Sequence, residues 1–258
     1  MNNHHLNILL LFLLLLAACG QPKPNDQSIF LLGKPVVIAE DGPAIFQYWD
    51  VKNEPVLWEK AEEGIHHLAL YRDSLRLVLG EVLFEKAVEK ERSQQFSGEP
   101  PSKEEPGYKT NAYLVHAGKL GHIRPINALE AQILNYQIGR YPMLGHPTEF
   151  HGFILKQDSL DLIRVYFASS DTPWPPKEGI IRDSLERDLS LGWTLYRHLH
   201  NHYEPDSNNY IGVLAPSMAD AHYYKMLSEN YNIDKTLITN GFYTVEMDNT
   251  EFGQFESH

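Results

Sequence analysis

The sequence predicts an α/β (α+β) fold, with a mixed sheet flanked by helices and a smaller N-terminal region that is mostly helical. Hydrophobic residues make up 43% of the 258 positions and charged residues 22%, which is ordinary for a globular chain with a sizeable core. Apolar residues in one N-terminal stretch recur mostly at helical spacing. Farther along, segments of strand type alternate with segments of helix type, which indicates a sheet and helices packed in layers.

The N-terminal region, residues 29–96, is expected to contain short strands followed by helices. Residues 29–49 mix short apolar stretches with Gly and Pro, a pattern typical of one or two strands with turns. From residue 55 to about residue 94, apolar side chains follow a 3.6-residue period, which favours helix. Residues 97–108 are rich in Pro, Glu, Ser and Gly, and predict a linker.

The C-terminal segment, residues 109–258, is expected to alternate between strands and helices. The expected strands cover residues 111–116, 150–156, 160–168, 193–202, 236–239 and 242–247. The expected helices cover residues 126–138, 180–191 and 216–230. A short polar turn joins the second and third of these strands, which predicts a hairpin.

Charge and cysteine content exclude several classes of function. Asp and Glu number 34 against 22 Lys and Arg, so the formal net charge is −12. Because binding to a phosphate backbone requires a basic surface, nucleic acid is not expected as a partner. The single cysteine, Cys19, excludes a disulfide within the chain, a Cys-rich zinc module and an iron–sulfur site.

The first residues are typical of a secretory signal. Residues 6–18 are almost wholly apolar, but the run is too short for a spanning helix, which needs about 20 residues. It ends in Leu-Ala-Ala followed by Cys19, which resembles the lipobox of bacterial lipoproteins. The resemblance implies that residues 1–18 are a lipoprotein signal peptide and that Cys19 carries the lipid. Residues 19–28 then form a tether, and the protein is anchored to a membrane of the bacterial cell envelope.

A histidine-rich stretch in an expected strand is the strongest sign of chemistry. Side chains two residues apart on a strand share a face, so His200 and His202 project side by side, suitably placed for one metal ion. Ser217 is a good N-cap for the next helix, and Asp220 falls in its first turn. Two histidines, one carboxylate and an open fourth position are typical of catalytic zinc. His198 shares the face, so His198/His200 is the alternative pair.

Upstream, Glu149 precedes the first strand of the expected hairpin, and Gly152 follows three residues later. The order Glu-x-x-Gly-Phe-Ile-Leu, then His-x-His, then Pro-Ser-x-x-Asp resembles the JAMM motif of the MPN (JAB-domain) zinc metalloproteases. The resemblance covers about residues 109–247 and leaves the N-terminal region outside. It implies an MPN/JAB-like fold for the C-terminal segment.

The resemblance also implies a role for each matching residue. The zinc ligands correspond to His200, His202 and Asp220, the general base to Glu149, and the oxyanion-holding serine to Ser217. In such a site, zinc-activated water attacks a peptide or isopeptide bond. The base passes the proton of the water to the leaving nitrogen, and a hydroxyl donor stabilises the charged intermediate.

The chain departs from the family pattern in two places. The family usually has proline directly after the second histidine, whereas Tyr203 and Glu204 precede Pro205 here. The family also places the aspartate several residues nearer, whereas Asp220 follows His202 by 18 residues. The additional residues belong to a polar loop, which we expect to be a mobile rim of the cleft. Loop-closure entropy changes slowly with length, so strand and helix need not move.

Other histidines and other chemistries have less support. His151 is expected to point to the opposite side of its strand from Glu149, and His66, His67 and His222 are expected to be surface or packing residues on helices. The sequence has no His-Glu-x-x-His, no Pro-Cys-x-x-Cys, no Gly-x-Ser-x-Gly and no Walker loop.

The function expected from these patterns is that of a lipid-anchored, zinc-dependent hydrolase of JAMM type, a metallopeptidase acting on a peptide or protein substrate. A non-catalytic MPN-like binding or scaffold lipoprotein of the cell envelope is one alternative. An envelope assembly lipoprotein whose histidine cluster is incidental is another. Metal content distinguishes the incidental cluster from the other two, and turnover distinguishes the hydrolase from the scaffold.

Overall fold

The computed structural model describes residues 32–61, 66–93, 100–102, 104–140, 148–177, 179–203 and 211–257. The strands are β1 (Val36–Asp41), β2 (Ala44–Lys52), β3 (His122–Pro125), β4 (Phe150–Gln157), β5 (Leu162–Ser169), β6 (Thr194–Asn201), β7 (Lys235–Thr239) and β8 (Tyr243–Asp248). The α-helices are α2 (His66–Leu79), α3 (Glu81–Ser93), α4 (Gly107–His116), α5 (Ala128–Arg140), α6 (Gly179–Ser190) and α7 (Met218–Tyr231).

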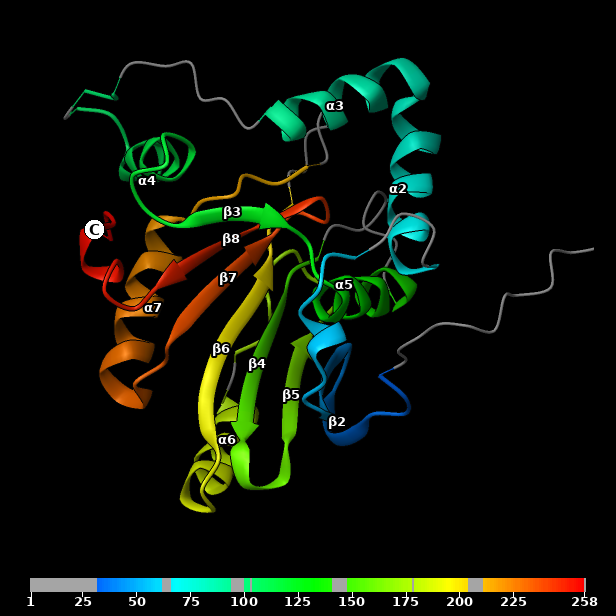
Figure 1. Cartoon of the computed structure of the whole chain (residues 1–258), viewed down its shortest axis with the longest axis vertical. Helices are drawn as coiled ribbons and strands as arrows, with labels where there is room; N and C mark the ends of the chain where they lie inside the picture. Colours follow the sequence, from blue (N-terminus) through cyan, green and yellow to red (C-terminus); the bar gives the residue numbers. More distant parts are fainter. Residues whose placement is uncertain are drawn as a thin grey trace, which may run out of the picture. The chain divides into compact units, whose positions relative to one another are not determined.

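All eight strands of the described residues form one sheet in the order β1-β2-β5-β4-β6-β7-β8-β3 (Figure 1). Neighbouring strands are antiparallel except β6 and β7, which are parallel and are connected through α7. A parallel pair requires a crossover connection, and a helix usually provides it. The mixed sheet with flanking helices confirms the α+β class predicted from the sequence.

Helices cover both faces of the sheet. The larger core lies between the sheet and α4, α6 and α7, and includes the almost fully buried Val115, Ile181 and Ala221. On the opposite face, the ring of Trp49 in β2 packs edge-on against Tyr136 of α5 at a centroid distance of 4.9 Å. The central strands β4 and β6 are therefore mostly buried on both sides, and the buried positions of β6 include the polar residues His198, His200 and Asn201.

Most expected elements are present, but residues 111–116 form the end of helix α4 and not a strand. Asn111 and Val115, four residues apart, are the buried positions of α4, which is the period of a helix face. The Asn111 amide donates to the Pro216 and Glu256 carbonyl oxygens at 3.1 and 2.9 Å. Tertiary contacts thus outweigh the β-type residues of this segment. The four-residue strand β3 was not expected.

The N-terminal region does not form a separate compact unit. Strand β2 pairs with β5 along almost its whole length, from Ile45↔Ser169 to Lys52↔Leu162. Residues 32–258 form one compact unit by contacts, so the composition change at residues 97–108 does not divide the structure there. The region is mostly helical after β2, as expected, because α2 and α3 follow.

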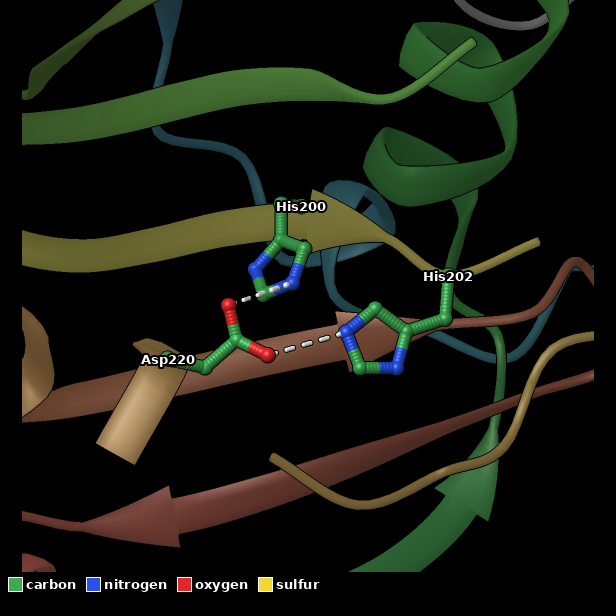
Figure 2. A group of neighbouring side chains, drawn as sticks. All are labelled: His200, His202 and Asp220. Atoms are coloured by element: carbon green, nitrogen blue, oxygen red, sulfur yellow. Dashed lines mark hydrogen bonds and ion pairs between the residues drawn. The ribbon is translucent and has the colours of Figure 1, made fainter. Parts of the chain in front are cut away.

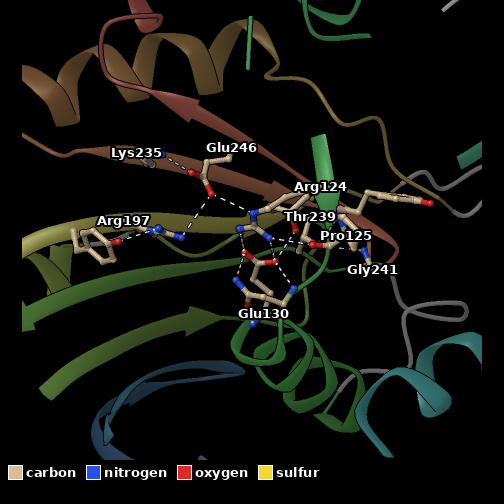
Figure 3. A network of polar contacts seen from close by, with 12 residues as sticks. Arg124, Pro125, Glu130, Arg197, Lys235, Thr239, Gly241 and Glu246 are labelled. Atoms are coloured by element: carbon tan, nitrogen blue, oxygen red, sulfur yellow. Dashed lines mark hydrogen bonds and ion pairs between the residues drawn. The ribbon is translucent and has the colours of Figure 1, made fainter. Parts of the chain in front are cut away.

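A buried ionic network joins the far edge of the sheet to α5 (Figure 3). Glu130 of α5, 1% exposed, receives hydrogen bonds from Arg124 of β3 at 2.5 and 3.0 Å. Arg124 also contacts Glu246 of β8 at 3.2 Å, and Glu246 accepts from Lys235 of β7 at 2.5 Å. Opposite charges thus connect β3, β7 and β8 across the sheet face that α5 covers.

The expected signal peptide, Cys19 and the tether lie outside the described residues. Among the residues that are described, none of the helices has the length and apolar character needed to cross a membrane.

Candidate metal centre

The central strand β6 and the first turn of α7 bring together three side chains that could bind a metal ion. His200 is the penultimate residue of β6, and His202 follows directly after the strand. Asp220 lies in the first turn of α7, whose N-cap is Ser217. The three side chains meet because β6 and α7 belong to the same crossover connection. Their donor atoms all lie within 4.8 Å of one another.

The Asp220 carboxylate faces both imidazole rings, with one oxygen directed at each (Figure 2). Its Oδ2 is 3.2 Å from Nε2 of His202, and its Oδ1 is 3.5 Å from Nε2 of His200. Two ligands of a tetrahedral zinc ion, at bond lengths of about 2.0–2.1 Å, stand about 3.3 Å apart. The spacing of these donors therefore suits a small metal ion.

A second contact fixes the remaining nitrogen of each ring. Nδ1 of His202 donates to the Val213 carbonyl oxygen at 2.7 Å, and Nδ1 of His200 lies 3.1 Å from the Tyr224 hydroxyl. Histidine ligands of metals usually have such a partner, which sets the tautomer and leaves Nε2 for the metal. Tyr224 comes from α7, so this helix provides both the candidate ligand Asp220 and a contact to the candidate ligand His200.

The charges of the triad respond to burial and to each other. Burial lowers the pKa of His200 to about 3, which keeps this ring neutral. Burial also disfavours the charged form of His202, but the hydrogen bond and charge of Asp220, with the charge of Glu149, raise its pKa to about 9. Burial opposes the Asp220 anion too, yet the charges of the two histidines and the side-chain hydrogen bonds of His202 and Ser217 hold its pKa well below its usual range.

These residues fit a metal ion. Nε2 of His200 is buried and has no hydrogen-bond partner among the described residues, and its contact with Asp220 at 3.5 Å is an ion-pair contact. A buried nitrogen with a lone pair directed at a carboxylate is costly unless a cation lies between them. His200, His202 and Asp220 could thus hold a metal ion.

Ser217 and Asp220 form a reciprocal cap at the start of α7. The Ser217 hydroxyl accepts the Asp220 N–H at 3.1 Å, and the Asp220 carboxylate accepts the Ser217 N–H at 2.8 Å. Such capping boxes satisfy two backbone donors that the helix itself cannot use. Here the box also fixes the rotamer of Asp220 beside the histidines.

A cleft of about 400 Å³ opens beside the triad. Its lining comprises Glu149, His151, Trp174, Pro175, His200, His202, Tyr203, Ser217, Ala219, Asp220 and Tyr223. All five residues expected to form the site in the folded domain therefore border one space. Trp174 is 73% exposed and forms part of the rim.

Asn201 fixes the position of Glu149 from the neighbouring strand. The fully buried Asn201 amide donates to the Thr148 carbonyl oxygen at 3.1 Å and accepts the Phe150 N–H at 2.9 Å. These contacts hold the residues on both sides of Glu149, just before β4 begins. In this position, the negative charge of Glu149 contributes to the raised pKa of His202.

The expectation for His151 was wrong, because His151 lines the cleft together with Glu149. Residues two apart along an extended chain share a side, which the earlier interpretation overlooked. His151 is also the direct cross-strand partner of His200. The ring of His198 lies on the same face, but its Nε2 is 3.0 Å from Nδ1 of His151, and His198 is not a member of the metal-binding group found among the described residues. The convergent pair is therefore His200 with His202.

Sequence reasoning also missed Gly212, Tyr224 and Asn201. A Cβ atom on Gly212 would lie 2.3 Å from the His202 carbonyl carbon, so only glycine allows this close approach. An asparagine within a buried strand, next to a histidine pair, could have indicated side-chain hydrogen bonds to a neighbouring backbone. Tyr224 gave no signal in the sequence. The expected rim loop, residues 204–210, lies outside the described residues.

Comparisons of the chain with protein-family models, curated proteins and solved structures gave no match. The described residues themselves provide three donors that could hold a metal ion. A carboxylate, Glu149, borders the same cleft.

Proposed function

We propose that this protein is a zinc-dependent hydrolase that resembles JAMM peptidases and cleaves a peptide or isopeptide bond. One observation carries the proposal: His200, His202 and Asp220, which could hold a metal ion, border the same cleft as Glu149. Structural zinc sites are closed by four protein ligands, whereas catalytic sites leave one position open. Among the described residues, the metal-binding group has three members.

In the proposed reaction, three residues would bind the metal and a fourth would transfer the proton. His200, His202 and Asp220 would hold zinc, which as a Lewis acid activates water and polarises the substrate carbonyl. Glu149 would accept a proton and deliver it to the leaving nitrogen, so its carboxylate must be ionised at the start.

Ser217 can serve both the helix and the substrate. Its oxygen accepts the Asp220 N–H, which leaves the hydroxyl hydrogen available to the cleft that Ser217 borders. Donation from this hydroxyl would stabilise the negative oxygen of the tetrahedral intermediate.

The proposal includes attachment to a membrane of the bacterial cell envelope through a lipid on Cys19. The support is the lipobox resemblance, with Cys19 the only cysteine of the chain. Two or more acyl chains anchor a protein stably, whereas one binds marginally. A Cys19→Ser variant expressed in a bacterial host should be released or remain unprocessed. Wild-type protein in the soluble fraction would contradict the anchor.

Metal content is the first test of the site. After exposure to zinc and removal of the excess, elemental analysis should give about one zinc ion per chain, as a single triad predicts. His202→Ala and Asp220→Ala should lose the metal. His122→Ala, which removes an exposed histidine of β3, is the matched control and should retain it. A metal-free wild-type protein would make the histidine cluster incidental.

Hydrolysis of a peptide library is the second test. Glu149→Gln should retain zinc and lose nearly all turnover, because the amide cannot accept the proton. Glu229→Gln, at an exposed position of α7, should behave as wild type. If Glu149→Gln loses zinc as readily as His202→Ala, Glu149 is a ligand and not the base. Zinc binding without any hydrolysis by the wild type would favour the non-catalytic scaffold.

A further inference from the structure

Two histidines on neighbouring strands form a hydrogen-bonded pair that ends in the cleft. His198 of β6 is fully buried, and its Nε2 lies 3.0 Å from Nδ1 of His151 in β4. The other nitrogen of His198, Nδ1, is buried and has no hydrogen-bond partner in the described part of the chain. Phe153 and Tyr223 pack against the His198 ring at centroid distances of 4.9 and 5.3 Å. His151, in contrast, borders the cleft.

The pair has two possible arrangements of its hydrogens when both rings are neutral, the form that burial favours. In the first, His198 donates from Nε2 to Nδ1 of His151, and the hydrogen of His151 is on its Nε2. In the second, His151 donates from Nδ1, and the hydrogen of His198 is on its own Nδ1.

The surroundings of His198 favour the first arrangement. The second would leave the Nδ1–H of His198 buried among aromatic rings without an acceptor. Buried N–H groups without an acceptor are rarer in proteins than acceptors without a donor. The first arrangement also gives both rings the Nε2–H tautomer, which neutral imidazole side chains prefer.

We propose that His151 is a substrate-binding residue that presents an Nε2–H donor to the cleft, and that His198 is the positioning residue that sets its tautomer. The inference rests on the proposed function, which supplies the substrate. The acceptor would be a carbonyl oxygen of the peptide or isopeptide. The cleft carboxylates of Glu149 and Asp220 can only accept, so a fixed donor beside them completes recognition of an amide.

The tautomer also separates His151 from the other roles in the site. With Nδ1 accepting from His198 and Nε2 bearing hydrogen, His151 has no lone pair for a metal or for a proton. Proton transfer thus remains with Glu149, and metal binding with the triad.

Nuclear magnetic resonance tests the tautomer without substrate or metal. In the full chain labelled with ¹⁵N-histidine, long-range ¹H–¹⁵N correlations distinguish Nε2–H from Nδ1–H rings, and variants of His151 and His198 assign their signals. Both rings should show Nε2–H, before and after addition of zinc. His198→Phe should give a mixture of tautomers at His151. His198→Gln, whose amide can still donate to Nδ1 of His151, should restore Nε2–H. An Nδ1–H tautomer at His151 would overturn the proposal.

Kinetics on a peptide that the wild type cleaves test the role. His151→Phe should retain one zinc ion and lower kcat/KM about threefold to tenfold, the usual effect of losing one neutral hydrogen bond. His151→Gln, which keeps an N–H donor, should recover part of the loss. Loss of zinc from His151→Phe, or unchanged kinetics, would overturn the proposal. If the wild type binds zinc but cleaves no peptide, the proposed function fails. The ¹H–¹⁵N spectra still show in that case whether His151 has the Nε2–H donor.

Discussion

Removal of the Glu130 carboxylate should destabilise the fold strongly. Glu130 accepts two hydrogen bonds from Arg124, two from Asn127 and one from Thr244, and its side chain is 1% exposed. Breaking a buried ion pair by removing one partner costs about 3–5 kcal/mol. Arg124 retains its contact with Glu246 after Glu130→Ala, which favours the lower half of this range. We therefore expect the free energy of unfolding to fall by about 3–4 kcal/mol.

Denaturant and thermal unfolding, followed by circular dichroism, measure this loss. At about 2–4 °C per kcal/mol for a domain of this size, the melting temperature should fall by roughly 6–16 °C. Glu130→Gln keeps the shape and one acceptor, so its loss should be smaller. Glu85→Ala, at an exposed position of α3, is the control and should stay within about 0.5 kcal/mol of wild type. A loss below about 1 kcal/mol for Glu130→Ala would refute the assignment of the network as stabilising.

Three further outcomes can be measured. Ser217→Ala removes the cap of α7 and should lower the free energy of unfolding by about 0.5–2 kcal/mol; unchanged thermal unfolding would contradict this role. Gly212→Ala should weaken zinc binding at least about tenfold in a metal titration, because its Cβ would displace the His202 backbone, whereas Gly253→Ala, in open space, should bind normally. Burial raises the pKa of Glu91, so Glu91→Gln should stabilise the protein at pH 7. This gain should fade as the pH falls through that raised pKa, and denaturant unfolding at several pH values would detect it; a constant gain would be inconsistent with the shift.

Local patterns predicted most elements of the fold. Continuous apolar runs with a turn between them identified the β4–β5 hairpin, and the period of 3.6 residues identified α5, α6 and α7. The prediction failed at residues 111–116, where contacts of Asn111 with distant carbonyl oxygens stabilise a helix. It also missed β3, whose four residues are too few to show a period. Its pairing with β8 provides the stabilisation that the local sequence lacks.

The candidate triad was predictable because its members lie on one strand and at one helix start. Period-two spacing identified His200 and His202, and the Ser-x-x-Asp cap identified Asp220. The contacts that surround these residues depend on the register between neighbouring strands. A single sequence does not reveal that register. His151 is adjacent to His200 only because β4 and β6 pair with that register. Asn201 holds the start of β4 for the same reason.

The parallel pairing of β6 with β7 through α7 bears on the order in which the molecule assembles. All three metal donors lie between residues 200 and 220, so they meet through contacts that are short in sequence. We expect such contacts to form earlier than the pairing of β2 with β5, which joins segments more than 100 residues apart and costs more loop-closure entropy. A metal ion present during refolding would thus bind a partly folded chain and act as a nucleus. Under this expectation, the strand β4 that follows Glu149 would pair with β6 after such an ion has bound.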